Sequence, residues 1–132
     1  MTLFGFLGVG VGAMCGAWLR WMLGLALNPL LPNLPLGTLT ANLAGGYLVG
    51  IALGSVEQFD TLAPEVRFML TTGFLGSLTT FSAFSSEAST LLLRHAYGWA
   101  SIVIGAHVIG SLLMTLLGVA TVSLIRTWLG NG

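Results

Sequence analysis

The sequence predicts an all-α integral membrane protein with four transmembrane helices, the third of which is broken near the membrane midplane. Hydrophobic residues make up 55% of the 132 positions and charged residues only 6%, and the mean hydropathy is +0.96. A soluble domain carries about 25% charged residues, so this chain cannot cover a water-facing surface and needs a surround of membrane lipid. Four apolar segments are each long enough to cross a bilayer, for which about 20 residues suffice. They form one predicted domain, residues 1–132, with spans at about 3–27, 36–56, 62–93 and 97–129.

Small residues recur at intervals of four in the first two segments. Residues four apart share a helix face, and small residues on one face let helix backbones approach closely in lipid. We expect both stripes to be helix-packing surfaces in a tightly packed oligomer. The glycines are Gly8, Gly12 and Gly16 in the first segment and Gly46, Gly50 and Gly54 in the second.

Asn42 begins the second of these stripes, one helical turn after Thr38. A side-chain amide in hydrocarbon needs hydrogen-bond partners, because burying it unpaired is costly. Asn42 either holds helices together or lines a polar path. Its place on the same face as Thr38 favours the polar path.

The third segment contains GFLGSLTTFSAFSSE, residues 73–87, where a continuous helix is not expected. A helix over the whole segment would be roughly 46 Å long, against a hydrocarbon core of about 30 Å. Glycine is a poor helix former, and irregular backbone at membrane depth is tolerated only inside protein or beside a wet cavity. We therefore predict a break near Gly76, because broken helices at the midplane mark ion or substrate sites in transporters.

Phe81 and Phe84 follow this break and share a helix face. Two such rings are usually core or lipid contacts, but polar residues surround this pair. The edge of an aromatic ring is electropositive, so two rings inside a polar path could meet an anion edge-on. The surrounding polar residues are Thr80, Ser82, Ser85, Ser86 and Glu87.

Glu87 has two interpretations that the sequence leaves open. An acid inside a membrane span is by default a functional residue. It could equally be an interfacial acid near the end of the span, since Arg94 follows two turns later.

The fourth segment carries a polar stripe of His107, Ser111 and Thr115, each four residues from the next. These side chains either satisfy one another and the helix backbone or line a path through the protein. A second His or Cys at metal-ligand spacing is missing from the sequence around His107, so we do not expect a zinc or copper site.

The arginines predict how copies of the chain assemble. Membrane proteins are oriented by the Lys/Arg difference between their two sides. With four spans, Arg67 and Arg126 fall on one side and Arg20 and Arg94 on the other, and the chain has no Lys. We hypothesise that copies insert both ways and pair as an antiparallel homodimer. The formal net charge is zero, which gives no reason to expect a nucleic-acid partner.

In such a dimer the two breaks near Gly76 would meet at the centre. Carbonyl oxygens freed at the breaks would then face one another, and unwound carbonyls hold sodium in transporters. The same arrangement would leave Phe81 and Phe84 of one copy free to face the second segment of the other.

Several runs of this sequence resemble the Fluc/CrcB family of bacterial fluoride channels. They are PLGTLTANLAG from Pro35 and TGFLGSLTTFSAFSSE from Thr72 to Glu87, together with GAWLRW around Arg20 and HVIGS from His107. The match covers nearly the whole chain. The TTFSxFSxE run with an upstream GTLxxN is far more specific than a glycine pattern.

The resemblance implies a dual-topology homodimer in the bacterial inner membrane, with two antiparallel pores at the subunit interface. It implies passive, highly selective fluoride conduction that lowers the cytoplasmic fluoride concentration, and a central structural sodium ion. Ala83 has no side-chain polar group, so any family contact made by a hydroxyl there is lost. Matching positions assign the fluoride pore to Asn42, Phe81, Ser82, Phe84, Ser111 and Thr115, the polar-track end and vestibule to Glu87, His107 and Arg20, and the sodium-binding carbonyls to Gly76 and Thr79.

The main alternative is a small proton-coupled multidrug transporter, which would also be a four-span, dual-topology dimer. That carrier needs a titratable acid at the membrane centre. The first two spans contain no acid, and Glu87 lies off centre. A membrane subunit that only assembles others would not need aligned polar stripes on three spans. An enzyme is not expected, because the sequence lacks a nucleophile and base pair, a phosphate-binding loop and a metal-ligand cluster.

Overall fold

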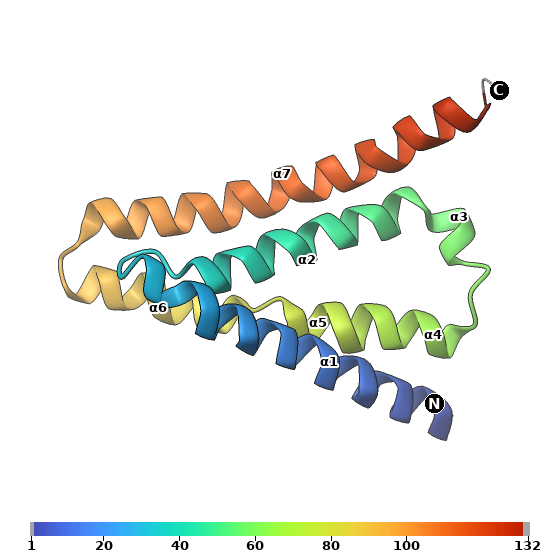
Figure 1. The fold of residues 1–132 in the computed structure, drawn as a ribbon, viewed down its shortest axis with the longest axis horizontal. Coiled ribbons are helices and arrows are strands. Elements are labelled where there is room, and N and C mark those ends of the chain that lie inside the picture. Colours follow the sequence, from blue (N-terminus) through green and yellow to red (C-terminus); the bar gives the residue numbers. More distant parts are fainter. Residues whose placement is uncertain (1, 131–132) are drawn as a thin grey trace.

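The computed structural model describes residues 2–130, so the two ends of the predicted domain 1–132 lie outside the described residues. Regular structure in that range is helical, and the chain runs back and forth between the two ends of an elongated bundle (Figure 1). The described N-terminal and C-terminal ends lie at the same end of the bundle. The elements are α1 (Leu3–Leu27), the 3₁₀ turn η1 (Asn28–Leu30), α2 (Leu36–Gly54), α3 (Val56–Phe59), α4 (Pro64–Phe68), the π-helix η2 (Met69–Leu75), α5 (Gly76–Leu78), α6 (Phe81–Leu93) and α7 (Tyr97–Gly130).

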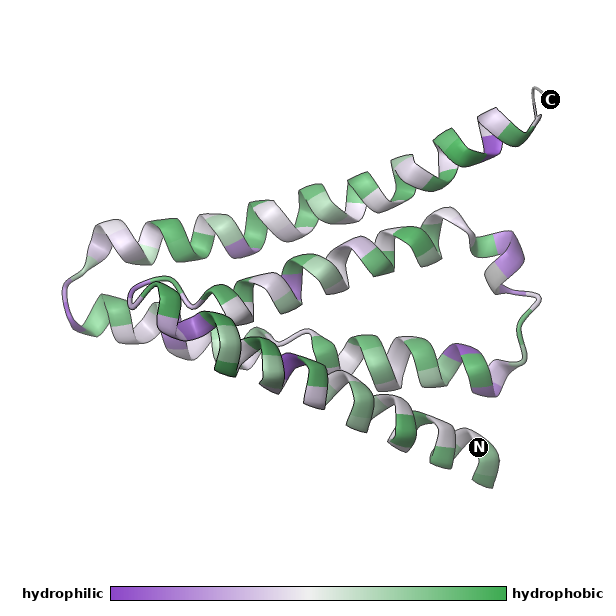
Figure 2. Cartoon of the chain, viewed as in Figure 1, coloured by the Kyte–Doolittle hydropathy of each residue, from purple (hydrophilic) through white to green (hydrophobic). Residues whose placement is uncertain are grey.

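Three helices within residues 2–130 are long and apolar enough to cross a membrane. In Figure 2 these helices are mostly apolar along their length, with few hydrophilic bands. They support the prediction of a multi-pass membrane protein. The α1 bounds equal the predicted 3–27, while α2 ends at Gly54 and α7 ends at Gly130. The candidate spans are Leu3–Leu30, Leu36–Gly54 and Tyr97–Gly130.

The predicted span 62–93 is interrupted, but not where we expected. Gly76 is helical, with φ −63° and ψ −28°. The chain becomes extended at Thr79 (φ −79°, ψ 153°) and Thr80 (φ −150°, ψ 114°), between α5 and α6. Thr80 is the N-cap of α6, and its hydroxyl oxygen accepts a hydrogen bond from the Ala83 N–H. An N-cap residue has extended backbone, so the restart of the helix fixes the break at the threonines.

The glycine stripe of α1 packs against η2 in the same chain. A Cβ on Gly12 would overlap the carbonyl oxygen of Met69, and a Cβ on Gly16 would overlap that of Phe74. Only glycine permits this approach of two helix backbones. The predicted packing role is therefore confirmed, although the partner is another segment of the same protomer.

The glycines of α2 and α7 form a second seam. A Cβ on Gly50 would overlap the Thr115 carbonyl oxygen, and a Cβ on Gly118 would overlap that of Tyr47. Each helix thus places glycine against the backbone of the other. This contact sets how closely the Asn42 stripe of α2 approaches the polar stripe of α7.

A tight turn joins α6 to α7, and a small apolar core lies between these two helices. His95 has φ 58°. Its N–H donates to the Leu92 carbonyl (3.0 Å), and the Ala96 N–H donates to the Leu91 carbonyl (2.9 Å), which closes the C-terminus of α6. The core beside this turn consists of Phe84, Ala88, Leu91, Ala100 and Val103.

Candidate functional site

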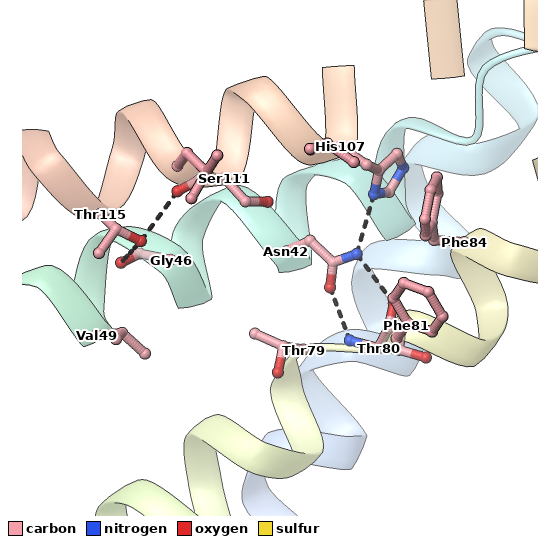
Figure 3. A pocket seen from close by; sticks show the side chains of 12 residues that line it. Asn42, Gly46, Val49, Thr79, Thr80, Phe81, Phe84, His107, Ser111 and Thr115 are labelled. Atoms are coloured by element: carbon pink, nitrogen blue, oxygen red, sulfur yellow. Dashed lines mark hydrogen bonds between the residues drawn. The ribbon is translucent and has the colours of Figure 1, made fainter. Parts of the chain in front are cut away.

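A groove of about 440 Å³ lies where α2, the extended threonines, α6 and α7 meet (Figure 3). Its wall combines apolar surface with an amide, an imidazole and several hydroxyl groups. Most of the predicted pore residues lie there. The lining residues are Asn42, Gly46, Val49, Thr79, Thr80, Phe81, Phe84, His107, Val108, Ser111, Leu112 and Thr115.

Asn42 binds the extended backbone at Thr80 through both ends of its amide. The Thr80 N–H donates to Asn42 Oδ1 (2.7 Å), and Asn42 Nδ2 donates to the Thr80 carbonyl (3.0 Å). In Figure 3 the amide reaches from α2 into the space between Thr80 and His107. Asn42 therefore supplies the broken segment with the hydrogen bonds that a helix would otherwise provide.

The break leaves two backbone carbonyl oxygens, those of Gly76 and Thr79, without their usual helical donors. In a continuous helix the Thr80 N–H would bond to the Gly76 carbonyl, and the Ala83 N–H to the Thr79 carbonyl. Here the Thr80 N–H donates to Asn42, and the Ala83 N–H donates to the Thr80 hydroxyl oxygen (3.2 Å). The carbonyls of Gly76 and Thr79 have thus lost their usual helical donors.

His107 lies on α7 opposite the break and is only 4% exposed. Its Nδ1 is 3.0 Å from Asn42 Nδ2. Its ring stacks on Phe84 with the centroids 4.7 Å apart and the planes inclined by 26°. The sequence placed His107 at the end of the polar stripe, whereas the structure places it against both Asn42 and an aromatic ring of the groove.

Phe81 and Phe84 are neighbours, as their spacing predicts, but their environments differ. The ring centroids are 5.5 Å apart, and the planes make an angle of 70°, an edge-to-face pair. Phe81 is 78% exposed, whereas Phe84 is 8% exposed. The expectation that both rings are free to face another copy is wrong for Phe84, because that ring already packs on His107.

Ser111 and Thr115 both line the groove, but the Thr115 hydroxyl is already bonded. Its Oγ1 lies 3.1 Å from the Gly46 carbonyl oxygen on α2 and 3.0 Å from the Ser111 carbonyl oxygen on its own helix. A hydroxyl has a single hydrogen to donate, so these two carbonyls share the Thr115 hydrogen and none is left for a ligand. Ser111 Oγ has no such contact among the described residues.

A second cavity of about 370 Å³ contains Arg20 and Glu87, and Thr80 lines both cavities. Glu87 accepts a 2.6 Å hydrogen bond from the Thr38 hydroxyl. Arg20 and Glu87 thus line the same cavity, and the functional interpretation of Glu87 stays a prediction. The α6–α7 turn carries Arg94, which is exposed.

Two predicted site residues, Ser82 and Gly76, line neither the groove nor the second cavity. Ser82 is exposed, and its hydroxyl lies 3.3 Å from that of Thr80. Gly76 is exposed on α5. The sequence places Thr80 among the polar residues around the two rings but does not identify it as a helix N-cap. A Thr before a new helical turn is an N-cap signal, and it could have located the break at Thr80.

Comparison with known proteins identifies the family. The family model described as CrcB-like protein, Camphor Resistance (CrcB), matches residues 7–119. This chain belongs to the CrcB family. The matched range includes every residue that lines the groove. Family membership confirms the resemblance seen in the sequence.

Three relatives illustrate how similar the CrcB-family chains are to this one over most of their length. A Nitrosospira multiformis protein is 55% identical over 122 residues, which cover 92% of this chain and 95% of the relative. A Tolumonas auensis protein is 53% identical over 124 residues (94% and 98%). A Pseudomonas paraeruginosa protein is 56% identical over 112 residues (85% and 88%). Each of the three is named fluoride-specific ion channel FluC.

Proposed function

We propose that this chain forms a passive, highly selective fluoride channel that exports fluoride and lowers its cytoplasmic concentration. Its relatives, at 53–56% identity over most of both chains, carry the name fluoride-specific ion channel. A channel of this kind is not an enzyme. The proposed location is the bacterial inner membrane, where the apolar helices would cross the bilayer as four passes.

The groove is the structural observation that carries this proposal. Fluoride is small and strongly hydrated, so a pore must replace its water with hydrogen-bond donors and electropositive groups. The groove offers an imidazole and a serine hydroxyl beside an edge-to-face pair of phenylalanines. The glycine seams hold this wall rigidly, and we propose that this rigidity keeps the path too narrow for chloride. Ser82, on the exposed side of α6, is proposed to lie near the ion path.

We propose that two copies pair antiparallel, with one pore along each side of the subunit interface. Phe81 is a large apolar ring that is 78% exposed at the mouth of the groove, and a second copy would cover it. The arginines also support dual topology. Arg67 donates to Asp60 in the α3–α4 connection and Arg126 donates to Gln58 of α3, whereas Arg94 lies at the α6–α7 turn.

A structural sodium ion at the centre of the dimer would be held by backbone carbonyls of Gly76 and Thr79 from both copies. These carbonyls suit a cation because the Thr80 N–H donates to Asn42 and the Ala83 N–H donates to the Thr80 hydroxyl. Both carbonyls are therefore without their helical donors. A hard cation prefers oxygen ligands of this type. The ion would join the two broken segments.

Arg20 and Glu87 are proposed to line the vestibule through which the ion enters. Their cavity shares Thr80 with the groove, so the two spaces adjoin. The positive charge of Arg20 would attract anions toward that entrance. The proton-coupled alternative gains no support from the names of the relatives.

Fluoride efflux from liposomes tests the proposal. Vesicles containing the purified protein should release fluoride without a pH gradient, and should release chloride far more slowly. Equal chloride and fluoride release would refute selectivity, and a need for a pH gradient would favour the proton-coupled carrier. A topology reporter fused to the C-terminus should appear on both sides of the membrane, and its appearance on one side only would exclude the antiparallel dimer.

A further inference from the structure

We propose that a cavity between the start of α1 and α4 binds a membrane phospholipid with a primary ammonium headgroup, phosphatidylethanolamine, and that Glu65 selects this headgroup. The cavity has a volume of about 670 Å³. Ligand pockets usually measure roughly 300–1,000 Å³, so a lipid headgroup with part of an acyl chain fits this space. Its lining residues differ from those of the groove, so the inference goes beyond the ion path.

The cavity begins at a polar end of the bundle and extends toward its apolar middle. The start of α1 and α4 lie side by side at this end (Figure 1). Figure 2 shows hydrophilic bands on α3 and α4 there, whereas α1 is mostly apolar. The α1 side of the cavity runs from Thr2 to Val9, roughly 10 Å along a helix. In a bilayer the cavity would thus lead from the headgroup level into the hydrocarbon.

Two phenylalanine rings form apolar walls of this cavity. Phe6 on α1 is 60% exposed and Phe68 on α4 is 56% exposed. Val9 lies deeper along the same side of α1. Apolar walls that face a lipid environment suit an acyl chain, which binds by van der Waals contact.

Glu65 places a carboxylate at the polar end of the cavity. The Thr2 hydroxyl donates to its Oε1 (3.2 Å). The stem of Glu65 lies on the first turn of α1, because a Cβ on Gly5 would be 3.7 Å from Glu65 Cγ. A carboxylate has about four acceptor sites, so most of its capacity remains for a ligand with several N–H donors.

The arginines at this end contact other acids. Arg67 lies 2.6 Å from Asp60, and Arg126 lies 3.9 Å from Glu57. Within residues 2–130, Glu65 forms no ion pair, although its side chain is only partly exposed. A primary ammonium group would supply both the missing positive charge and hydrogen-bond donors.

The start of α1 provides a partner for the lipid phosphate beside this carboxylate. The Thr2 hydroxyl oxygen accepts from the Gly5 N–H. The N–H groups of Leu3 and Phe4 have no preceding helical turn to which they could donate. A helix N-terminus carries partial positive charge and binds phosphate. A zwitterionic headgroup would therefore meet an opposite charge at each of its two ends.

Photochemical crosslinking in vesicles tests this site. Phe68 is replaced by the photoreactive p-benzoylphenylalanine, and the protein is reconstituted with equal amounts of phosphatidylethanolamine and phosphatidylcholine that carry the same acyl chains. Both lipids are zwitterionic, but only the first has N–H donors. We expect about threefold more phosphatidylethanolamine adducts in the intact-protein mass spectrum, as an ion pair at a partly exposed site implies.

Two carboxylate variants in this background separate the site from general surface charge. Glu65→Gln can still accept from Thr2 but lacks the charge, and it should bring the adduct ratio close to one. Glu57→Gln removes an acid at the same end but outside the cavity, and it should leave the preference unchanged. The photoreactive residue placed instead at Leu124 of α7, which is 65% exposed, should capture both lipids equally. Gel filtration checks that each variant assembles as the wild type does.

Four results would overturn the inference. They are equal capture of both lipids at position 68, a preference that survives Glu65→Gln, lack of lipid adducts at position 68 when position 124 yields them, and crosslinks from position 68 mainly to a second copy of the chain. Because the measurement counts captured lipid, its outcome is independent of whether the protein conducts fluoride.

Discussion

The groove has two walls that are built in different ways. The α2–α7 wall consists of continuous helices whose backbones touch at Gly50 and Gly118. The α5–α6 wall is interrupted, and the Thr80 N–H and carbonyl, which lack helical partners there, bond to the Asn42 side chain. The first wall has no room for any added atom at the contact. The second depends on a few hydrogen bonds, so the two walls should fail in different ways when they are altered.

The largest effect is expected at the α2–α7 seam. Gly118→Val would drive side-chain atoms into the Tyr47 carbonyl, and neither helix backbone can yield without separating. Overpacking of this kind should cost more than about 3 kcal/mol and abolish folded, assembled protein. Gel filtration after expression measures the outcome.

The control for this variant is Gly105→Ala in the same helix, where a Cβ has no neighbour within 4 Å. It should be neutral or stabilise the protein by about 0.5–1 kcal/mol, because Ala is the better helix former. A well-folded Gly118→Val protein would mean that the two walls of the groove tolerate substitutions equally well.

A smaller effect is expected on the interrupted wall. Asn42→Ala leaves the Thr80 N–H and carbonyl without their partner and removes the amide group that lies against His107 Nδ1. We expect a loss of about 2–3 kcal/mol, measured as a lower unfolding midpoint in detergent, with most of the protein still folded but without fluoride flux. Asn33→Ala, in the exposed connection before α2, is the matched control and should change neither property. An unchanged midpoint in Asn42→Ala would contradict its role at the break.

The same contrast explains what the sequence could predict. Glycine spacing in α1 and α2 reports directly on helix packing, because absence of a Cβ acts through the local backbone. The hydrogen bond from the Thr80 N–H to Asn42 joins residues 38 positions apart, and no local pattern reports it. Because the sequence does not reveal that bond, it predicts the break at Gly76, the residue nearby with the lowest helix propensity.

For the site residues too, local spacing predicts some contacts and misses others. Spacing alone brought Phe81 next to Phe84, and the stripe on α7 does line the groove. Spacing did not reveal that Phe84 is covered by His107, nor that the Thr115 hydroxyl is bonded to α2. Both facts depend on the close approach of helices that are far apart in sequence.

A third prediction separates the side chain of Thr80 from its backbone. Thr80→Ala removes the cap of α6, in which the hydroxyl oxygen accepts from the Ala83 N–H, but keeps both backbone bonds to Asn42. Loss of an N-cap costs about 1 kcal/mol, so the unfolding midpoint should fall less than in Asn42→Ala. Thr80→Ser keeps the hydroxyl and should retain most of the stability. A fall in Thr80→Ala as large as that in Asn42→Ala would show that the cap, rather than the amide, holds the break.

The smallest effect is expected where the two walls are joined, at the turn between α6 and α7. His95 has a left-handed backbone, which costs a non-glycine residue about 1 kcal/mol, while its Nδ1 lies 3.0 Å from the Tyr97 hydroxyl. His95→Gly removes the strain together with this exposed contact, so we expect a net gain of about 0.5 kcal/mol and a slightly higher unfolding midpoint. His95→Ala loses the contact but keeps the strain, and it should lower the midpoint. If both variants lowered it equally, the contact with Tyr97 rather than the backbone would set the stability of the turn, and the junction would resemble the side-chain-dependent wall of the groove.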